Sequence, residues 1–248
     1  MTQIGIIGGS GLDDRQILQN PVLRSVETPY GPPSSPLTFG HIKGHPVVLV
    51  DRHGRGHKLS PSQVNYRANL YALKSQGVTH VLATTACGSL REEIQRGDFV
   101  ILDQFIDFTR LRKNTIYESF AEGAHHTAMA DPFDPGLRRL LIDTARQLGF
   151  AVHPKGTVVT IEGPRFSTRA ESNMFRLWGG DVINMSVATE AIVANEMQIP
   201  YAAVAMSTDY DCWKQDEAPV SWDQILEVFT RNADRVTELL AAAILNFT

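Results

Sequence analysis

Short apolar runs alternate along the chain with longer segments whose apolar residues recur every three or four positions. The apolar runs predict strands over residues 3–7, 46–50, 80–85, 99–102, 157–161, 182–185 and 201–206. The longer segments predict a helix that opens at Ser60-Pro61 and ends at Gly77, and helices over about 135–148, 168–178, 189–197 and 222–245. This alternation favours an α/β fold, with a mixed, mostly parallel twisted sheet and helices on both faces.

One stretch, residues 109–134, has neither the apolar run of a strand nor the apolar spacing of a helix. It contains several basic side chains and the pair His125-His126. A long irregular segment inside a compact domain is usually a lid, a binding loop or a subunit contact. No linker or internal repeat divides the chain, and 43% of its 248 residues are hydrophobic. We therefore expect residues 1–248 to form a single domain around a large core.

Composition narrows the class of partner. The formal net charge is -4 and no basic block occurs, which argues against nucleic acid as the main partner. No apolar run is long enough to cross a bilayer, and the chain opens on a strand rather than a signal peptide. Only two cysteines are present, Cys87 and Cys212, so a reducing compartment and a cytoplasmic location are expected.

Two aspartates, Asp209 and Asp211, follow the apolar run over 201–206. Ligands of open α/β sheets bind outside the carboxyl ends of the strands, so these carboxylates lie where a ligand is expected. A carboxylate pair accepts hydrogen bonds from amino groups or shares a proton with a ring nitrogen, which indicates purine binding. The alternative is that the pair caps the turn after the strand, where aspartate is common.

Two segments that follow early strands carry groups suited to an anion. Gly8-Gly9-Ser10-Gly11 lets backbone amides approach an anion and adds the Ser10 hydroxyl, but it has the spacing of neither a dinucleotide fingerprint nor a P-loop. Arg52 and His53 add a planar guanidinium fork and an imidazole donor. A plain glycine turn and a solvated basic loop are the alternatives. A metal site at His53 and His57 also stays open, although the glycines between them disfavour a rigid helix.

Three further segments end predicted strands with polar or aromatic groups. Thr84–Leu90 offers hydroxyls and amides, Glu162–Phe166 an aromatic ring that can stack on a base, and Ile183–Ser186 an amide and a hydroxyl. Cys87 could act as a nucleophile, but no neighbouring residue marks it as activated, and a small buried cysteine is the alternative. Together with the aspartates, these segments predict an enzyme that handles a purine and a phosphate.

The same motifs, in one order along nearly the whole chain, resemble the trimeric purine nucleoside phosphorylase and methylthioadenosine phosphorylase family. The matching segments are 8–12, 52–55, 84–94, 160–167, 182–185 and 208–213. The family splits the glycosidic bond of a nucleoside with inorganic phosphate as co-substrate, giving a free base and a ribose 1-phosphate derivative. The resemblance therefore implies the nucleoside phosphorylase fold, a pentosyltransferase activity in purine and methionine salvage, small-molecule substrates, and no metal or organic cofactor.

The resemblance also implies residue roles. The phosphate would be surrounded by Ser10, Arg52, His53, Thr85, Ala86 and Ser186. Phe166 and Met185 would pack on the base and sugar, and the role of Asn184 between the motif residues stays open. Asp209 and Asp211 would face the purine and act in catalysis with Ser186, Asp209 by sharing a proton if its pKa is raised.

Two carboxylate acceptors favour a 6-aminopurine. With that preference, the resemblance implies S-methyl-5'-thioadenosine as the substrate, with 5'-deoxyadenosine or adenosine as further candidates. The alternative within the class is a phosphorylase of 6-oxopurine nucleosides: inosine, guanosine or methylthioinosine. A hydrolase and a non-catalytic nucleoside-binding or metal-binding protein are the interpretations from other classes. The hydrolase would need a placed water in the position of the phosphate.

At the five-prime end of the nucleoside, the matching positions are Trp222, Ile225 and Leu226, for which ordinary core packing is the alternative. Trp222 stands where the family has a smaller aliphatic residue, which leaves open whether a methylthio, deoxy or hydroxyl group is preferred. The family also borrows a histidine from a neighbouring subunit, which maps to His126. The resemblance thus implies a homotrimer, or a dimer of trimers, and a subunit-contact role for residues 109–134.

Overall fold

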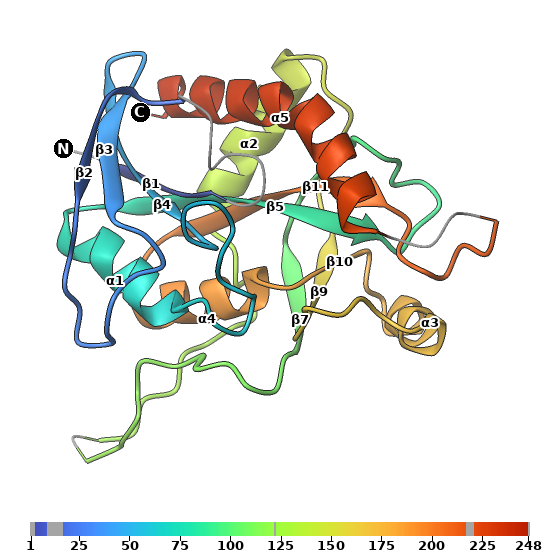
Figure 1. The fold of residues 1–248 in the computed structure, drawn as a ribbon, viewed down its shortest axis with the longest axis horizontal. Helices are drawn as coiled ribbons and strands as arrows, with labels where there is room; N and C mark the ends of the chain where they lie inside the picture. Colours follow the sequence, from blue (N-terminus) through green and yellow to red (C-terminus); the bar gives the residue numbers. More distant parts are fainter. Residues whose placement is uncertain (1–2, 9–16, 122, 217–220, 248) are drawn as a thin grey trace.

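The computed structural model describes residues 3–8, 17–121, 123–216 and 221–247, whose strands all join one mixed sheet (Figure 1). The outer strands are β2 (Gln19–Arg24), β3 (Leu37–Ile42), β6 (Phe99–Ile101), β7 (Gln104–Phe108) and β8 (Val152–His153). The inner strands are β1 (Ile4–Gly8), β4 (His45–Asp51), β5 (His80–Ser89), β9 (Thr157–Ile161), β10 (Val182–Asn184) and β11 (Tyr201–Asp209). The predicted α/β class is confirmed.

Strand β5 is the centre of the sheet. It pairs in parallel with β1 and β11 and, near its carboxyl end, antiparallel with β10. From β1 the sheet continues through β4 and β3 to β2, and from β10 through β9 to β7. This arrangement gathers the carboxyl ends of β4, β5, β10 and β11 around one region, as expected for an open α/β sheet.

Five described helices cover the two faces of the sheet (Figure 1). Their bounds are α1 (Tyr66–Ser75), α2 (Pro135–Gln147), α3 (Arg169–Leu177), α4 (Val187–Glu196) and α5 (Trp222–Leu245). One core cluster packs α1 and α4 on one face, and a second packs α2 and α5 on the other. Of these helices, none combines the length and the apolar character needed to cross a lipid bilayer.

The helix expected to open at Ser60-Pro61 begins later, at Tyr66. Residues 60–63 form a turn instead, in which the Gln63 amide donates to the Ser60 carbonyl (2.9 Å). The N-cap is Asn65, whose side-chain oxygen accepts from the amide of Ala68 at 3.2 Å. Serine before proline is a good signal for a helix start. Asn65 is favoured as the cap because its side-chain amide also donates to the carbonyl of Tyr30 (2.8 Å), which is distant in sequence.

Strands β2, β3, β7 and β8 do not come from apolar runs, so the hydrophobic pattern did not predict them. Every residue of β2 is exposed, and β7 is half-buried along its whole length. Peripheral strands of this kind carry little hydrophobic signal because at most one side of each meets the core. Strand β5 also extends four residues beyond the predicted 80–85, to Ser89, because Gly88 pairs with both β10 and β11.

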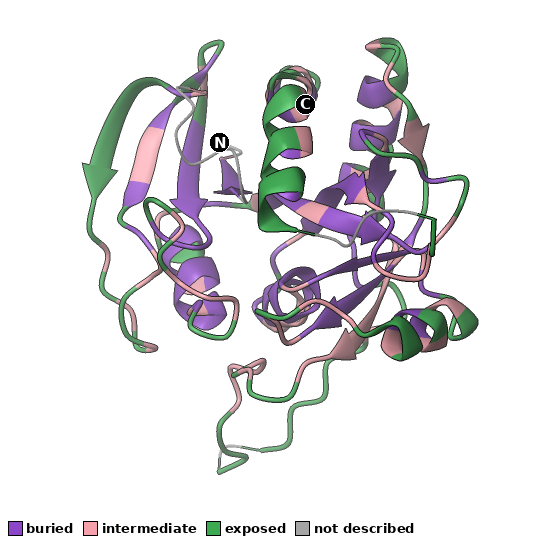
Figure 2. Cartoon of the chain, turned by 45° about the vertical axis from the view of Figure 1, so that its right-hand side comes forward, coloured by how far each residue is buried: buried purple, intermediate pink, exposed green. Residues whose placement is uncertain are grey.

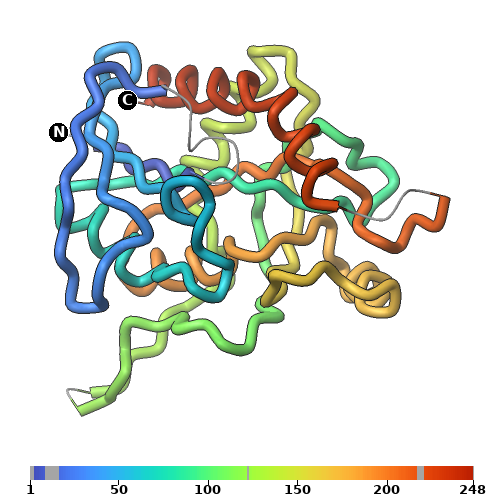
Figure 3. Tube along the Cα trace, viewed as in Figure 1, coloured from blue at the N-terminus to red at the C-terminus, as the bar shows by residue number. Residues whose placement is uncertain are grey.

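Described residues of the irregular segment 109–134 form neither helix nor strand, as predicted, and they project from the body of the molecule below α4 (Figure 3). Most of them are exposed (Figure 2). The first leg is fixed by Glu162, which accepts from the amides of Arg110 (2.7 Å) and Leu111 (3.0 Å) and from the side chain of Arg112 (2.9 Å). The segment is therefore held firmly at its base and extended beyond it.

Candidate active site

An open pocket of about 610 Å³, its mouth included, lies at the carboxyl ends of β4, β5, β10 and β11 under the start of α5. Nine of the predicted site residues line it: Arg52, His53, Thr85, Ala86, Met185, Ser186, Asp209, Trp222 and Ile225. Four others do not line it in this chain: Phe166, Asp211, Leu226 and His126. Ser10 lies outside the described residues.

Gly88 explains both the length of β5 and the placement of Asp209. It pairs with Ile183 of β10 on one side and with Asp209 of β11 on the other. A Cβ on Gly88 would lie 2.9 Å from the Asp209 carboxylate and 3.1 Å from the Ile183 side chain, so only glycine leaves room for these two side chains. The register of β11 shifts between Ser207 and Asp209, and this bulge is what brings both Thr208 and Asp209 to the pocket wall.

The Asp209 carboxylate is largely enclosed by protein. One oxygen accepts from the Thr208 hydroxyl and the other from the amide of Asp211, both at 2.8 Å. Burial raises the pKa of Asp209 to about 6, against the opposing effect of these two hydrogen bonds. A carboxyl with this pKa carries its proton in about a tenth of the molecules at pH 7, far more often than an ordinary aspartate, which favours proton sharing with a purine nitrogen.

Asp211 lies in a different environment from Asp209, although only one residue separates them. Its backbone is in the left-handed region (φ 49°), and its carboxylate lies beside the hydroxyls of Ser167 and Ser172 on the α3 side. The Sγ atom of Cys212 is 4.0 Å from it. The sequence predicted two carboxylates on the purine. The structure places one in the pocket and directs the other toward α3.

Arg52 is 1% exposed and forms a bidentate ion pair with Glu190 of α4. Its Nε donates to one carboxylate oxygen at 2.5 Å, its Nη2 to the other at 2.9 Å, and its Nη1 to the carbonyl of Thr84 at 2.7 Å. Although burial opposes it, the Glu190 carboxylate raises the pKa of Arg52 above its usual value. The guanidinium fork expected to grip an anion is therefore held by Glu190, and only the remaining N–H groups are left for a ligand.

His53 follows Arg52 and lines the pocket. Its Nδ1 lies 2.9 Å from the carbonyl of Leu59, which can only accept, so Nδ1 carries the hydrogen. Burial, with the nearby charge of Arg52, lowers the pKa of His53 to about 3. The ring is neutral and its Nε2 is an acceptor, rather than the donor that the sequence suggested. Toward a phosphate, it would accept the hydrogen of a P–OH group.

Asn184, whose role the sequence left open, ties the anion end together. Its side-chain oxygen accepts from the Thr160 hydroxyl (2.8 Å), and its amide nitrogen donates to the Thr85 hydroxyl (3.3 Å). Thr160 in turn accepts from the amide of Ala188 in the first turn of α4 (3.1 Å). Ser186 is the N-cap of α4, but its side chain makes no capping hydrogen bond. Its hydroxyl stands at a helix N-terminus, where anions are favoured.

The other end of the pocket is formed by Trp222 and Ile225 of α5 with His57 and Pro61 from the loop after β4. Ile225 is buried, whereas Trp222 is 44% exposed. Leu226, predicted beside them, is 39% exposed and does not line the pocket. The spacing i, i+3 and i+4 puts all three residues on one broad face of α5, but only Trp222 and Ile225 reach the pocket.

Sequence reasoning gave no role to two residues that the structure makes important. Glu190 has no place in the sequence analysis, although a lone acidic residue inside the apolar segment 187–194 was an available signal. His57 was considered only as a metal ligand with His53. The two rings do meet, stacked with centroids 4.2 Å apart. In the described part of the chain, however, no group of three or more His, Cys, Asp or Glu side chains is placed to hold a metal ion.

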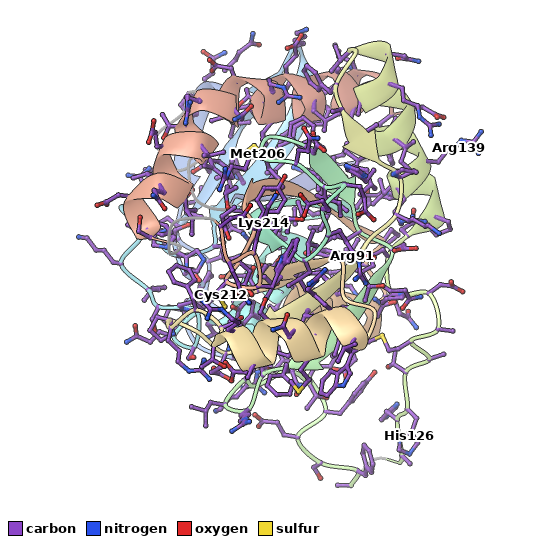
Figure 4. The ribbon with its side chains drawn as sticks, turned by 90° about the vertical axis from the view of Figure 1, so that its right-hand side faces the viewer. Arg91, His126, Arg139, Met206, Cys212 and Lys214 are labelled. Atoms are coloured by element: carbon purple, nitrogen blue, oxygen red, sulfur yellow. The ribbon has the colours of Figure 1, made fainter. Side chains whose placement is uncertain are left out.

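Cys87 lines the pocket, and burial raises the pKa of its thiol well above the usual value. A protonated thiol is a poor nucleophile, so the buried-cysteine interpretation is favoured. His126 lies on the projecting segment, far from Cys212 and the turn that follows Asp209 (Figure 4). Within its own chain it cannot reach the pocket.

Three comparisons with known proteins agree with this geometry. The sequence model of the Phosphorylase superfamily matches residues 3–245. The chain is 55% identical over 246 residues to the S-methyl-5'-thioadenosine phosphorylase of Xenopus tropicalis, covering 98% of this chain and 88% of that protein. The methylthioadenosine phosphorylase of Schistosoma mansoni in complex with adenine superposes with a TM-score of 0.94 at 42% identity, over 99% of this chain and 92% of that one. A mutant of the same enzyme in complex with methylthioadenosine gives 0.93, also at 42% identity, over 99% and 91%.

Proposed function

The chain belongs to the phosphorylase superfamily, and on that premise we propose that it cleaves S-methyl-5'-thioadenosine with inorganic phosphate to adenine and 5-methylthioribose 1-phosphate. The proposal is supported by the names of its relatives and by the pocket, which combines an anion end with a carboxylic acid suited to a purine. A phosphate oxygen forms a bond to the anomeric carbon of the sugar as the bond to the purine nitrogen breaks. The bonding electrons leave with the base.

At the anion end, the phosphate lies at the N-terminus of α4, within reach of the Ser186 hydroxyl and the Thr85 segment of β5. The remaining N–H groups of Arg52 and the neutral imidazole of His53 complete its surroundings. Because Glu190 and Asn184 hold these groups in place before the anion arrives, little reorganisation is needed during the reaction. Catalysis rests on this positioning of the nucleophile and on electrostatic stabilisation.

At the nucleoside end, the protonated carboxyl of Asp209 donates to the ring nitrogen that gains charge as the base departs. In its ionised form the same carboxylate accepts from a 6-amino group, whereas a 6-oxo group has no hydrogen to donate. The single observation that carries the proposal is the placement of Asp209, with its burial-raised pKa, in the same pocket as the anion end. Inorganic phosphate acts as a co-substrate, and the proposed reaction requires neither a metal nor an organic cofactor.

The test is release of base from S-methyl-5'-thioadenosine with and without phosphate, beside 5'-deoxyadenosine, adenosine and inosine. We expect phosphate-dependent adenine release with inosine inert. Turnover of inosine would show that the pocket selects 6-oxopurines instead. Adenine release without phosphate would indicate a hydrolase, and nucleoside binding without turnover would leave a binding protein.

We further propose a homotrimer, or a dimer of trimers, in which the projecting segment brings His126 to the pocket of a neighbouring subunit. The support is its exposure and its distance from the pocket of its own chain (Figure 4). Sedimentation analysis tests the assembly. A mixing experiment tests the shared site, because refolding His126→Ala with Asp209→Asn subunits should produce some pockets with both native residues. Mixed assemblies no more active than either variant would contradict it.

A cytoplasmic location is proposed on the same terms. It is supported by two cysteines that form no disulfide, one buried and one partly buried. Fractionation of the source cells, with the protein detected by antibody, would test it, and recovery in an extracellular fraction would contradict it.

A further inference from the structure

Three rings form a continuous wall of the pocket. His53 stacks on His57 with ring centroids 4.2 Å apart and an interplanar angle of 25°. His57 then meets the indole of Trp222 at 5.0 Å and 42°. All three side chains line the pocket, and we call them the ring column. The column runs from the anion end to the start of α5, so it touches both places where substrates are expected.

The two histidines of the ring column are held by a tightly closed loop. The amide of Leu59 donates to the carbonyl of His53 at 2.9 Å, and His53 Nδ1 lies 2.9 Å from the carbonyl of Leu59. The amide of His57 donates to the carbonyl of Gly54 at 3.1 Å, and His57 has a left-handed backbone with φ 55°. The backbone of both residues is thus fixed, and the contact between the stacked rings is the route by which a displacement of the His57 ring reaches His53.

The indole is the adjustable member of the ring column. Trp222 is the first residue of α5 and is 44% exposed, whereas His53 is 9% exposed. The N-cap hydrogen bond next to it, from the Gln224 amide to Ser221, is long at 3.4 Å. A nucleoside whose five-prime group enters this end of the pocket meets the indole before it meets either histidine.

We propose that the ring column couples the two subsites, so that the group on the five-prime carbon of the nucleoside sets the affinity of the pocket for phosphate. The inference rests on the proposed function. A methylthio group is long and polarisable enough to pack on the indole, and it holds Trp222 against His57 and His57 against His53. The five-prime methyl group of 5'-deoxyadenosine is shorter and lets the indole of Trp222 move away from His57. The coupling is reciprocal in binding: phosphate strengthens the preference for the methylthio nucleoside.

The test compares the KM for phosphate at saturating S-methyl-5'-thioadenosine and at saturating 5'-deoxyadenosine. For the native protein we expect a value about fivefold lower with the methylthio nucleoside. Trp222→Val should make the two values equal, whereas Trp222→Phe, which still carries a ring that can stack, should retain most of the ratio. His57→Asn keeps a residue that tolerates the left-handed backbone but removes the ring, so it should also abolish the ratio. The double variant Trp222→Val with His57→Asn should give the same ratio of phosphate KM values as either single variant, because both changes break the same contact.

Trp178→Val is the matched control. Trp178 is 51% exposed, lies at the C-cap of α3 and does not line the pocket, so its variant should keep the native ratio. Equal phosphate KM values in the native protein, or a native ratio in Trp222→Val, would overturn the coupling. Failure of the proposed function has a different signature: base release without phosphate, or no heat of phosphate binding to the nucleoside-free protein by calorimetry.

Discussion

At the anion end of the pocket, Arg52 and Asn184 are held by hydrogen bonds to distant parts of the chain, and His53 by one to Leu59 in its own loop. At the nucleoside end, Trp222 is 44% exposed and is held by ring contact with His57. In the proposed reaction, the first end binds phosphate, whose shape does not vary, and the second binds nucleosides that differ in their five-prime group. Fixed polar groups suit a fixed ligand because they need no reorganisation, and an adjustable apolar wall suits a variable one.

The two aspartates also differ in their surroundings. Asp209 lies at a β-bulge in the pocket wall, while Asp211 lies beyond it against the α3 side. Burial raises the pKa of both carboxyls, so burial alone does not identify the catalytic one. Only the direction of the side chain does so, and that depends on the bulge. Substitutions at each end of the pocket test this difference.

The largest effect is expected from Glu190→Ala. It leaves the guanidinium of Arg52 buried without its carboxylate, and removal of one partner from such a pair typically costs about 3–5 kcal/mol of unfolding free energy. Chemical denaturation of the native and variant proteins measures it. The matched control is Glu227→Ala, whose ion pair with Arg231 lies on the exposed face of α5 and should matter by less than about 1 kcal/mol. Equal losses in the two variants would show that the anion end is not held as described.

Asp209→Asn should lower kcat/KM for S-methyl-5'-thioadenosine by about 10²-fold or more, because the amide cannot transfer a proton to the departing base. Asp211→Asn is the matched control and should cost less, since its carboxylate lies outside the pocket. Steady-state kinetics with both variants decide between the two carboxylates. A greater loss in Asp211→Asn would mean that the substrate turns Asp211 inward.

The pH profile gives a related measurement. Native kcat/KM should fall as the pH rises through about 6, where the Asp209 carboxyl loses its proton. The Asp209→Asn variant should lack this fall, and its pH profile should show only the titration of phosphate itself. A raised pKa favours the protonated folded state. Relative to the variant, native stability should therefore decline as the pH rises from near 4 through about 6. Identical limbs in both proteins would contradict the assignment.

A smaller effect is expected from Asn184→Ala. It leaves the Thr160 hydroxyl without its acceptor and removes the donor to the Thr85 hydroxyl, which then keeps only its bond to the Ala86 carbonyl. Loss of buried hydrogen bonds of this kind costs about 1–3 kcal/mol. The KM for phosphate should rise while the KM for nucleoside changes little. The exposed C-cap residue Asn246 supplies the control variant, Asn246→Ala. An unchanged phosphate KM would limit Asn184 to a role in stability.

The smallest change in stability is expected from Trp222→Ala, within about 1 kcal/mol, because the side chain is 44% exposed. Thermal unfolding of this variant and of Trp178→Ala, which is 51% exposed, provides the comparison. A large loss at Trp222 would show that the nucleoside end is as firmly built as the anion end. The contrast between the two ends would then disappear.

The sequence alone determined the fold class, most of the inner strands and helices, and most of the residues that line the pocket. Apolar runs predict inner strands because both sides of each strand meet the core, and the polar groups that follow them reach the pocket because the carboxyl ends of strands gather at one edge. Prediction was weakest at the periphery, where β2 and β7 carry no apolar run, and at the start of α1, where a contact distant in sequence favoured Asn65 as the cap.

Only the tertiary structure decided where each polar side chain points and what it binds. The fork of Arg52 faces Glu190, 138 positions away, and the tautomer of His53 follows from the Leu59 carbonyl. Asp209 separates from Asp211 because of a bulge and because Gly88 leaves room for it. A residue type states which bonds a side chain can make. Which of them it makes depends on partners that only the folded chain brings near, and for that reason the chemistry could be read in advance while the geometry could not.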